Sequence, residues 1–217
     1  LYGMVIFTTM CHQCKINQMK KIHAGVWFLI VIVLGLNTTR AQEVDNHTRA
    51  LLIIDIQYFY FPGGSVPLFE PEKASKQAGK VLQAFREKGM PVIHVRHQTR
   101  QGGDIHEDVK PVDGEPVFTK TEVNAFQGTG LLEYLRDHQV QSLVIMGMQT
   151  HMCLEAATRA AHDYGFECTV IADACATRDL EFEGRLVTAP DVHASTLNTL
   201  NGNYARIVTA DEFLAGL

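Results

Sequence analysis

Short, continuous apolar runs alternate with amphipathic helical patterns along most of this chain, and this alternation constrains its fold most strongly. Leu51–Asp55 and Ser142–Met146 are apolar but for one terminal residue, which is the pattern of strands buried on both faces. Pro71–Lys88 carries its apolar residues at helical spacing. Because parallel strands are joined by crossover helices, this order predicts an α/β fold: a three-layer, doubly wound, Rossmann-like sheet of six parallel strands with helices on both faces. The remaining strands are expected at Pro91–Val95, Val117–Lys120, Cys168–Ala172 and Arg206–Thr209, and the remaining helices at Leu131–Leu135, His151–Tyr164, Asp191–Leu200 and after Asp211.

Two connecting segments are long for this kind of fold. Gln98–Glu115 is polar and rich in Gly and Asp, and Thr177–Pro190 carries mixed charge. Long loops in compact domains often act as lids over functional sites. Disordered decoration is the alternative for the first of them.

The start of the chain has the layout of a targeting segment. Met19-Lys20-Lys21 is basic, Ala24–Leu36 is apolar, and Thr39-Arg40-Ala41 places small residues before a cut at Gln42. An apolar run of this length is short for a bilayer span. An uncleaved N-terminal anchor is therefore the weaker alternative, and no stable membrane span is expected after processing.

These features predict three parts. Residues 19–41 are expected to be a signal peptide, and residues 42–217 a single domain that is large enough for a full core. Residues 1–18 precede the expected start methionine and are interpreted as upstream read-through. We therefore expect an exported protein, periplasmic or secreted, with its signal cleaved before Gln42.

Charge and cysteine content narrow the partners of this domain. The chain has 19 Lys and Arg against 24 Asp and Glu, a net charge of −5, and none of the acidic residues precedes Gln42. Without a basic block, nucleic-acid binding is not expected. The expected domain keeps Cys153, Cys168 and Cys175, and an odd number leaves at least one free thiol. We expect no disulfide, since the strand between Cys168 and Cys175 holds them apart.

Three reactive side chains, those of Asp55, Lys120 and Cys153, stand at or just beyond the ends of predicted strands. The carboxyl ends of parallel strands meet at one edge of the sheet, where open α/β folds bind ligands. Taken alone, each residue has a structural reading: a hydrogen-bonded acid, a solvated lysine and a buried cysteine. Together they suit an activated nucleophile, with Asp55 taking the thiol proton and Lys120 holding thiolate and carboxylate in place.

Cys153 falls in the first turn of an expected Ala-rich helix, with Thr150 as its N-cap. The positive end of the helix dipole is expected to lower the pKa of this thiol. The backbone N–H groups of Gln149 and Cys153 are expected to stabilise an oxyanion. Such an arrangement suits attack on an amide or imide carbonyl, giving a thioester that water hydrolyses.

The loops that carry these residues also predict a substrate pocket. A mixed aromatic and polar wall suits a small planar or cyclic amide. Plain core packing is the alternative for each aromatic residue. The residues predicted to bind substrate are Gln57, Tyr60, Phe61, Phe126 and His151.

The predicted site residues belong to four ordered motifs: Asp55–Gln57, Lys120 with Asn124–Thr129, Gly147–Cys153 and Asp173–Asp179. In these motifs and their spacing, the segment from about residue 49 to 217 resembles the isochorismatase-like cysteine hydrolases, which include nicotinamidases, N-carbamoylsarcosine amidases and streptothricin hydrolases. The resemblance implies an Asp–Lys–Cys triad at Asp55, Lys120 and Cys153. It also implies a cis peptide bond at Met148–Gln149, the same six-stranded fold, and a homo-oligomer.

One departure from nicotinamidases bears on metal binding. Those enzymes carry an Asp-x-His metal motif after the second strand, whereas this chain has Val95-Arg-His97-Gln98 there. His94 and His97 are expected on opposite faces of a strand, and His106 and Glu107 form no specific motif. We therefore predict no metal and no cofactor, and nicotinamide becomes a less expected substrate.

The sequence as a whole predicts an exported cysteine hydrolase that cleaves a carbon–nitrogen bond, amide, imide or carbamoyl, of a small molecule. One alternative is a non-catalytic small-ligand-binding protein on the same fold. Another is an isochorismatase-type vinyl-ether hydrolase, a class that typically lacks the nucleophilic cysteine, so Cys153 counts against it. A dinucleotide-dependent oxidoreductase needs a Gly-rich turn after the first strand, and Asp55–Tyr60 offers none.

Overall fold

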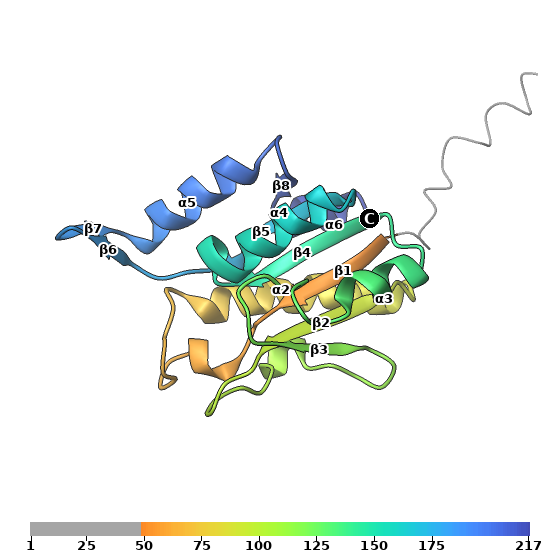
Figure 1. Cartoon of the computed structure of the whole chain (residues 1–217), viewed down its shortest axis with the longest axis horizontal. Coiled ribbons are helices and arrows are strands. Elements are labelled where there is room, and N and C mark those ends of the chain that lie inside the picture. The colour runs from red at the N-terminus through yellow and green to blue at the C-terminus, as the bar shows by residue number, and fades with distance from the viewer. Residues whose placement is uncertain (1–48) are drawn as a thin grey trace, which may run out of the picture. The chain divides into compact units, whose positions relative to one another are not determined.

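Six of the predicted apolar runs form strands of one parallel sheet, in a computed structural model that describes residues 49–217 (Figure 1). The predicted read-through segment 1–18 and signal peptide 19–41 lie outside the described residues. The order across the sheet is β3-β2-β1-β4-β5-β8, and each neighbouring pair is parallel. The strands are β1 (Arg49–Ile54), β2 (Val92–His97), β3 (Val117–Lys120), β4 (Ser142–Met148), β5 (Glu167–Ala176) and β8 (Arg206–Val208).

Helices cover both faces of this sheet, which confirms the predicted doubly wound fold. Leu51 and Ile53 of β1 pack on one face with α2 (Pro71–Glu87) and α6 (Ala210–Ala215). Leu52 and Ile54 belong to the cluster on the opposite face. That face is covered by α3 (Leu131–Asp137), α4 (Glu155–Asp163) and α5 (Ala189–Leu200). Because side chains of a strand alternate between faces, a strand covered on both sides must be apolar throughout.

The order of the strands reverses its direction at the position of the predicted chemistry. From β1 the chain builds outward through β2 and β3, and from β4 it builds the other way through β5 and β8. The carboxyl ends of β1 and β4 therefore form the topological switch point, where loops leave in opposite directions and a ligand can enter.

Gly147 allows β4 to pass very close to β1 just before this switch point. Its φ is 141°, and a Cβ built there would overlap the carbonyl oxygen of Ile54. Only glycine fits this close backbone approach.

Two predicted boundaries differ from the observed ones. The predicted helix His151–Tyr164 is in fact a π-helical turn, η4 (Thr150–Leu154), followed by α4. The predicted strand Cys168–Ala172 runs on as far as Ala176, since β5 pairs with β4 again beyond a shift in register.

The segment Thr177–Pro190 was predicted as a loop, but it contains an antiparallel hairpin. Its strands are β6 (Leu180–Phe182) and β7 (Arg185–Val187), which within residues 49–217 pair only with each other. Glu183 and Gly184 join them with φ values of 50° and 74°, the left-handed pair that a tight hairpin turn requires. Because charged residues of both signs are spread through this segment, it does not show the apolar alternation from which a strand is predicted.

The long segment Gln98–Glu115 is anchored to the chain just after β1, at the carboxyl end of the sheet, and to α2. It contains η3 (Glu107–Val109), whose Val109 is fully buried. The backbone N–H of His106 donates to the carbonyl of Ile56 at 2.8 Å, and the Ser75 hydroxyl donates to Asp108 at 2.6 Å. The segment is therefore packed structure rather than loose decoration. The remaining short helix is η2 (Tyr58–Tyr60).

Among residues 49–217, no helix is long and apolar enough to cross a bilayer. Cys153, Cys168 and Cys175 are all buried free thiols.

Candidate active site

The three predicted catalytic side chains lie in direct contact at the switch point. Asp55 directly follows β1, Lys120 ends β3, and Cys153 lies in η4 after β4. The ammonium of Lys120 is 2.7 Å from Asp55 Oδ2 and donates to Cys153 Sγ at 3.2 Å. Since β2 separates β3 from β1 in the sheet, only a long side chain such as lysine can reach across it.

The group is sealed from solvent. Asp55 is fully buried, Lys120 is 1% exposed, and Cys153 is 5% exposed. A carboxylate and an ammonium are rarely buried unless they are paired. The lysine is thus the counter-ion that allows the acid to occupy this position.

The backbone of Asp55 adopts an uncommon conformation. Its φ is 51°, in the left-handed region, which non-glycine residues seldom occupy and which Asp tolerates better than most. Its N–H donates to the carbonyl of Val95 at 2.9 Å. Such backbone outliers gather at functional sites, where the surrounding structure holds them in place.

Burial dominates the acid–base properties of this group. It raises the pKa of the Asp55 carboxyl above its usual range, although the charge of Lys120 opposes the change. Burial, and next the negative charge of Asp55, raise the pKa of the Cys153 thiol to about 12, against the opposing effect of Lys120. The thiol therefore keeps its proton at neutral pH until a base removes it during reaction.

The prediction that a helix dipole lowers the Cys153 pKa is therefore wrong. Thr150 does not cap a helix, because it lies inside the π-helical turn, and neither η4 nor α4 begins with a side-chain cap. The Thr150 hydroxyl instead lies 3.0 Å from His193 Nδ1. Desolvation of the buried thiol and the nearby charge of Asp55 raise this pKa instead.

His97 is a member of the site that sequence reasoning did not include. Its Nδ1 lies 3.0 Å from the Lys120 ammonium, and its ring is half-buried. Burial, followed by the charge of Lys120, lowers the His97 pKa, which favours the neutral ring. The parallel pairing of His97 with Lys120 at the ends of β2 and β3 brings them together. The contact depends on the register between β2 and β3, which local sequence patterns do not show.

Gln57 holds the backbone rather than facing a substrate. Its amide accepts a hydrogen bond from the N–H of His97 at 2.7 Å. It also donates to the carbonyls of His97 and Gly103, at 3.0 and 2.6 Å. With its amide engaged and fully buried, the geometry favours a supporting role over the predicted substrate contact.

Tyr60, Gln149 and Arg178 form a polar chain beside the triad. The Arg178 guanidinium donates to the Gln149 side chain at 3.3 Å, and Gln149 donates to the Tyr60 hydroxyl at 3.4 Å. Burial raises the pKa of Tyr60, and the charges of Cys153 and Asp55 also raise it, so its phenol remains protonated. Arg178 is exposed, so this series of hydrogen-bonded side chains reaches the solvent.

Two further predicted pocket residues rest against neighbouring loops. His151 Nδ1 lies 2.6 Å from the Thr177 hydroxyl, and burial lowers the His151 pKa. Phe61 stacks on His106 with ring centres 3.8 Å apart. Neither contact involves the triad.

Phe126 packs against two aromatic rings beyond the end of α4. Its ring packs on Tyr164 and Phe166, which follow the far end of α4. Cys153 precedes the other end of that nine-residue helix, which is about 13 Å long. These ring contacts favour the alternative of core packing, and a role for Phe126 in substrate binding stays a prediction.

The backbone of the nucleophile turn has the conformation that the family resemblance implied. The peptide bond between Met148 and Gln149 is cis, which confirms that expectation. The N–H groups of Met152 and Leu154 donate to the carbonyl of Gln149 at 3.1 and 3.3 Å. An oxyanion contact from the N–H groups of Gln149 and Cys153 stays a prediction.

Within residues 49–217, no group of three or more His, Cys, Asp or Glu side chains is arranged to hold a metal ion. The two histidines near the expected metal motif serve other partners. His94 Nε2 lies 2.8 Å from Glu115, whereas His97 contacts Lys120.

Comparison with known proteins agrees with this geometry. The Isochorismatase domain family matches residues 49–212. The isochorismatase family protein YddQ of Bacillus subtilis is 43% identical over 77% of this chain and 99% of its own. The crystal structure of an isochorismatase-family hydrolase from Oleispira antarctica shares 43% identity and a TM-score of 0.76, over 81% of this chain and 100% of that one. Maleamate amidohydrolase of Pseudomonas putida is 26% identical over 77% of this chain and 86% of its own.

These similarities and the parallel α/β fold define a class of enzyme. The chain belongs to the isochorismatase family of hydrolases.

Proposed function

We propose that this protein is a cysteine hydrolase that cleaves a carbon–nitrogen bond, amide, imide or carbamoyl, of a small molecule. One observation carries the proposal: a single lysine ammonium lies 2.7 Å from Asp55 and 3.2 Å from the sulfur of Cys153. This geometry gives the cysteine a base and gives both groups a shared counter-ion. The family relative named as an amidohydrolase supports this type of bond.

In the proposed reaction, Asp55 takes the proton from the Cys153 thiol as the sulfur attacks the substrate carbonyl. A base with a raised pKa suits a thiol with a raised pKa, because the proton then moves between groups of more similar affinity. The tetrahedral intermediate breaks its carbon–nitrogen bond, and the leaving nitrogen takes the proton from Asp55. Water, deprotonated by Asp55, then hydrolyses the thioester.

Lys120 stabilises the negative charge on each group that carries this charge during the reaction. The charge begins on Asp55 and passes to the sulfur and the carbonyl oxygen, and the ammonium contacts both starting groups. His97, neutral and 3.0 Å away, orients the lysine from the solvent side. The predicted oxyanion donors, Gln149 and Cys153, act on the intermediate.

The walls of the site favour a small polar substrate. Tyr60 and the side chain of Gln149 offer a hydroxyl and an amide beside the triad, and Arg178 lies next to them. Such donors suit the second carbonyl or carboxylate of a compact amide.

The test is a panel of primary amides and carbamoyl compounds, read by ammonia release, together with cyclic imides, read by chromatography of the ring-opened half-amide. Cys153→Ala is expected to lower turnover by about a thousand-fold or more. The matched control is Cys168→Ala, which removes a buried thiol at the opposite end of the sheet and should retain most activity. Intact-mass analysis of quenched reactions should show an acyl adduct on Cys153. Equal turnover in the Cys153→Ala variant would reject the nucleophile.

We further propose that the protein is exported. The basic, apolar and small-residue segments at 19–41 support this, since they follow the order of a signal peptide. Sequencing the N-terminus of protein recovered outside the cytoplasm should give Gln42. A start at Met19 in that material would reject cleavage.

A further inference from the structure

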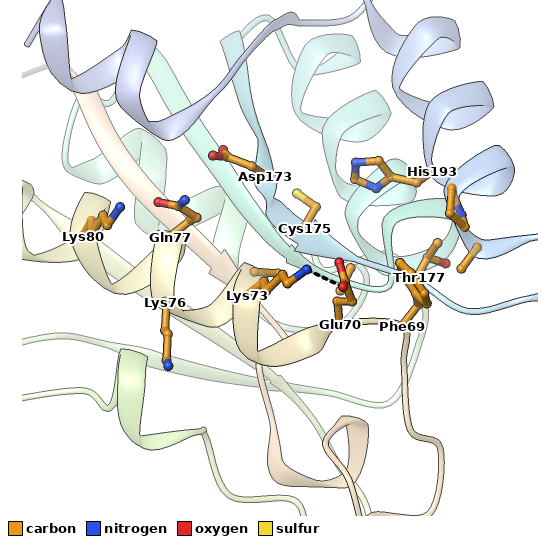
Figure 2. A pocket seen from close by; sticks show the side chains of 14 residues that line it. Phe69, Glu70, Lys73, Lys76, Gln77, Lys80, Asp173, Cys175, Thr177 and His193 are labelled. Atoms are coloured by element: carbon orange, nitrogen blue, oxygen red, sulfur yellow. Dashed lines mark hydrogen bonds and ion pairs between the residues drawn. The ribbon is translucent and has the colours of Figure 1, made fainter.

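A groove lies between α2, the end of β5 and the start of α5 (Figure 2). Its volume is about 600 Å³, which is within the range of pockets that bind small molecules. Asp55, Lys120 and Cys153 do not line it. The groove is therefore separate from the catalytic triad.

The surface of the groove is mainly apolar. Ala74, Ala176 and Pro190 line it, together with Phe69, whose side chain is 53% exposed. A half-exposed aromatic ring beside small apolar side chains is a surface on which a flat apolar body can pack. The groove therefore suits a ligand with a compact apolar part.

One polar atom in the groove has no partner. The side-chain oxygen of Gln77 is buried and receives no hydrogen bond from any of the described residues. A buried acceptor usually has a donor, and leaving it unpaired destabilises the fold. A hydroxyl or N–H group of a bound molecule supplies the missing donor.

The acidic residues that line the groove already have partners. Glu70 is paired with Lys73, and Asp173 accepts a backbone N–H of α6 at 2.7 Å. Lys76 and Lys80, which also line the groove, form no ion pair within residues 49–217. The groove therefore has an excess of positive charge, which favours an anionic ligand.

Lys80 is the better placed of these two lysines. In Figure 2, the side chains of Lys80 and Gln77 lie on the same side of α2, whereas Lys76 points away from Asp173 and Cys175. Residues three apart on a helix are neighbours on its surface. A ligand whose anionic group contacts Lys80 therefore reaches the unpaired oxygen of Gln77.

We propose that the groove is a second binding site of this protein, for a small organic anion that has a compact apolar body and a hydroxyl or N–H donor. The anionic group pairs with Lys80, and the donor bonds to Gln77. The apolar body packs on Phe69 and Ala176. Binding at this site is independent of the proposed hydrolysis, because none of these residues belongs to the triad.

Two hydrogen bonds connect the groove to the nucleophile turn. Thr177 and His193 line the groove. The Thr177 hydroxyl lies 2.6 Å from His151 Nδ1, and His193 Nδ1 lies 3.0 Å from the Thr150 hydroxyl. Both contacted residues belong to η4, as Cys153 does. A ligand that holds Thr177 and His193 in place therefore also holds this turn closed over the nucleophile.

Calorimetric titration with 4-hydroxyphenylacetate tests the site, since this probe combines a carboxylate, a flat ring and a hydroxyl. We expect saturable binding to the wild type. Lys80→Met and Gln77→Leu should each weaken it about tenfold or more, because each removes one polar contact. The matched control, Lys88→Met, alters an exposed lysine at the end of the same helix and outside the groove, and should bind as the wild type does. Absence of saturable binding would overturn the proposal.

Two analogues of the probe test the chemistry of the contacts. Phenylacetate lacks the hydroxyl, so it should bind the wild type and Gln77→Leu equally. In 4-hydroxyphenethylamine an ammonium replaces the carboxylate, so it should bind the wild type about tenfold more weakly or less than that. Equal affinity for the amine would exclude pairing with Lys80.

Alkylation of Cys153 by iodoacetamide tests the connection to the nucleophile turn without any substrate. At a probe concentration ten times its Kd, alkylation of the wild type should slow about tenfold, because the probe must leave before the turn opens. This protection should disappear in Lys80→Met at the same concentration and persist in Lys88→Met.

Three results would overturn the proposal. Protection that persists in Lys80→Met would place the probe in the candidate active site instead. Alkylation that is unchanged by bound probe would show that the groove does not act on the turn. Probe affinity that falls as the protein concentration rises would mean that a neighbouring copy of the chain fills the groove.

Discussion

Replacing Asp55 by Asn is expected to destabilise the fold strongly, because it leaves a buried ammonium without its counter-ion. The Lys120 ammonium lies 2.7 Å from the carboxylate, and both side chains are inaccessible to solvent. Removing one partner of a buried ion pair costs about 3 to 5 kcal/mol. For a domain of this size, that lowers the melting temperature by about 6 to 20 °C. Asn has nearly the same shape as Asp, so the loss reports charge rather than packing.

A double-mutant cycle separates the ion pair from the cost of burying each group. Lys120→Met, which keeps an unbranched side chain, should also destabilise by about 3 kcal/mol or more, since Asp55 is then unpaired. Asp55→Asn with Lys120→Met removes both charges and should cost less than the sum of the single changes, by about 2 kcal/mol or more. Urea unfolding at pH 7 measures all four proteins.

Additive effects in this cycle would refute the reasoning. So would a loss below about 1 kcal/mol in Asp55→Asn, the range of a solvent-exposed pair. Either result would mean that water reaches the pair in solution.

Three other predictions follow from the same structure. Arg86, His94 and a backbone N–H lower the pKa of Glu115 to about 2 from 4.5. The Glu115 carboxylate therefore stabilises the fold by about 2 to 3 kcal/mol, an effect that is complete above pH 5 and disappears as the pH falls towards 2. Glu115→Gln should flatten that part of the acid unfolding curve. An unchanged curve would contradict this prediction. Because the pKa of Cys153 is about 12, the rate of its alkylation by iodoacetamide should rise about tenfold per pH unit from pH 7 to 9.5. Peptide mapping measures this rate. A plateau near pH 7 would show a lowered pKa instead. Gly147→Ala should cost about 3 kcal/mol or more in thermal unfolding, since its Cβ overlaps Ile54, whereas Gly89→Ala, with open space around it, should cost about 1 to 2 kcal/mol.

The sheet and most of the helices were predictable because burial on both faces leaves a direct mark on composition. A strand such as β1 must be apolar throughout, and a helix such as α2 must show one apolar stripe. The hairpin β6–β7 shows no such pattern, since neither face of it is buried among residues 49–217. The sequence pattern therefore predicts a loop there.

The candidate site was only partly predictable. Asp55, Lys120 and Cys153 stand at strand ends, so topology alone brings them to one edge. Phe126 is also near a strand end in the sequence, yet its ring packs at the far end of α4. Sequence distance from a catalytic residue does not show the direction in which a side chain points.

The amino-acid sequence by itself determined the parallel sheet and the gathering of an acid, an ammonium and a thiol at its switch point. Both follow from local patterns, because the side-chain period and the order of elements leave few possible topologies. Only the tertiary structure decided the protonation of Cys153, the contact of His97 with Lys120 and the supporting role of Gln57. These depend on burial and on distances between segments remote in sequence, and the desolvation that raises the pKa of Cys153 exists only once the chain has folded.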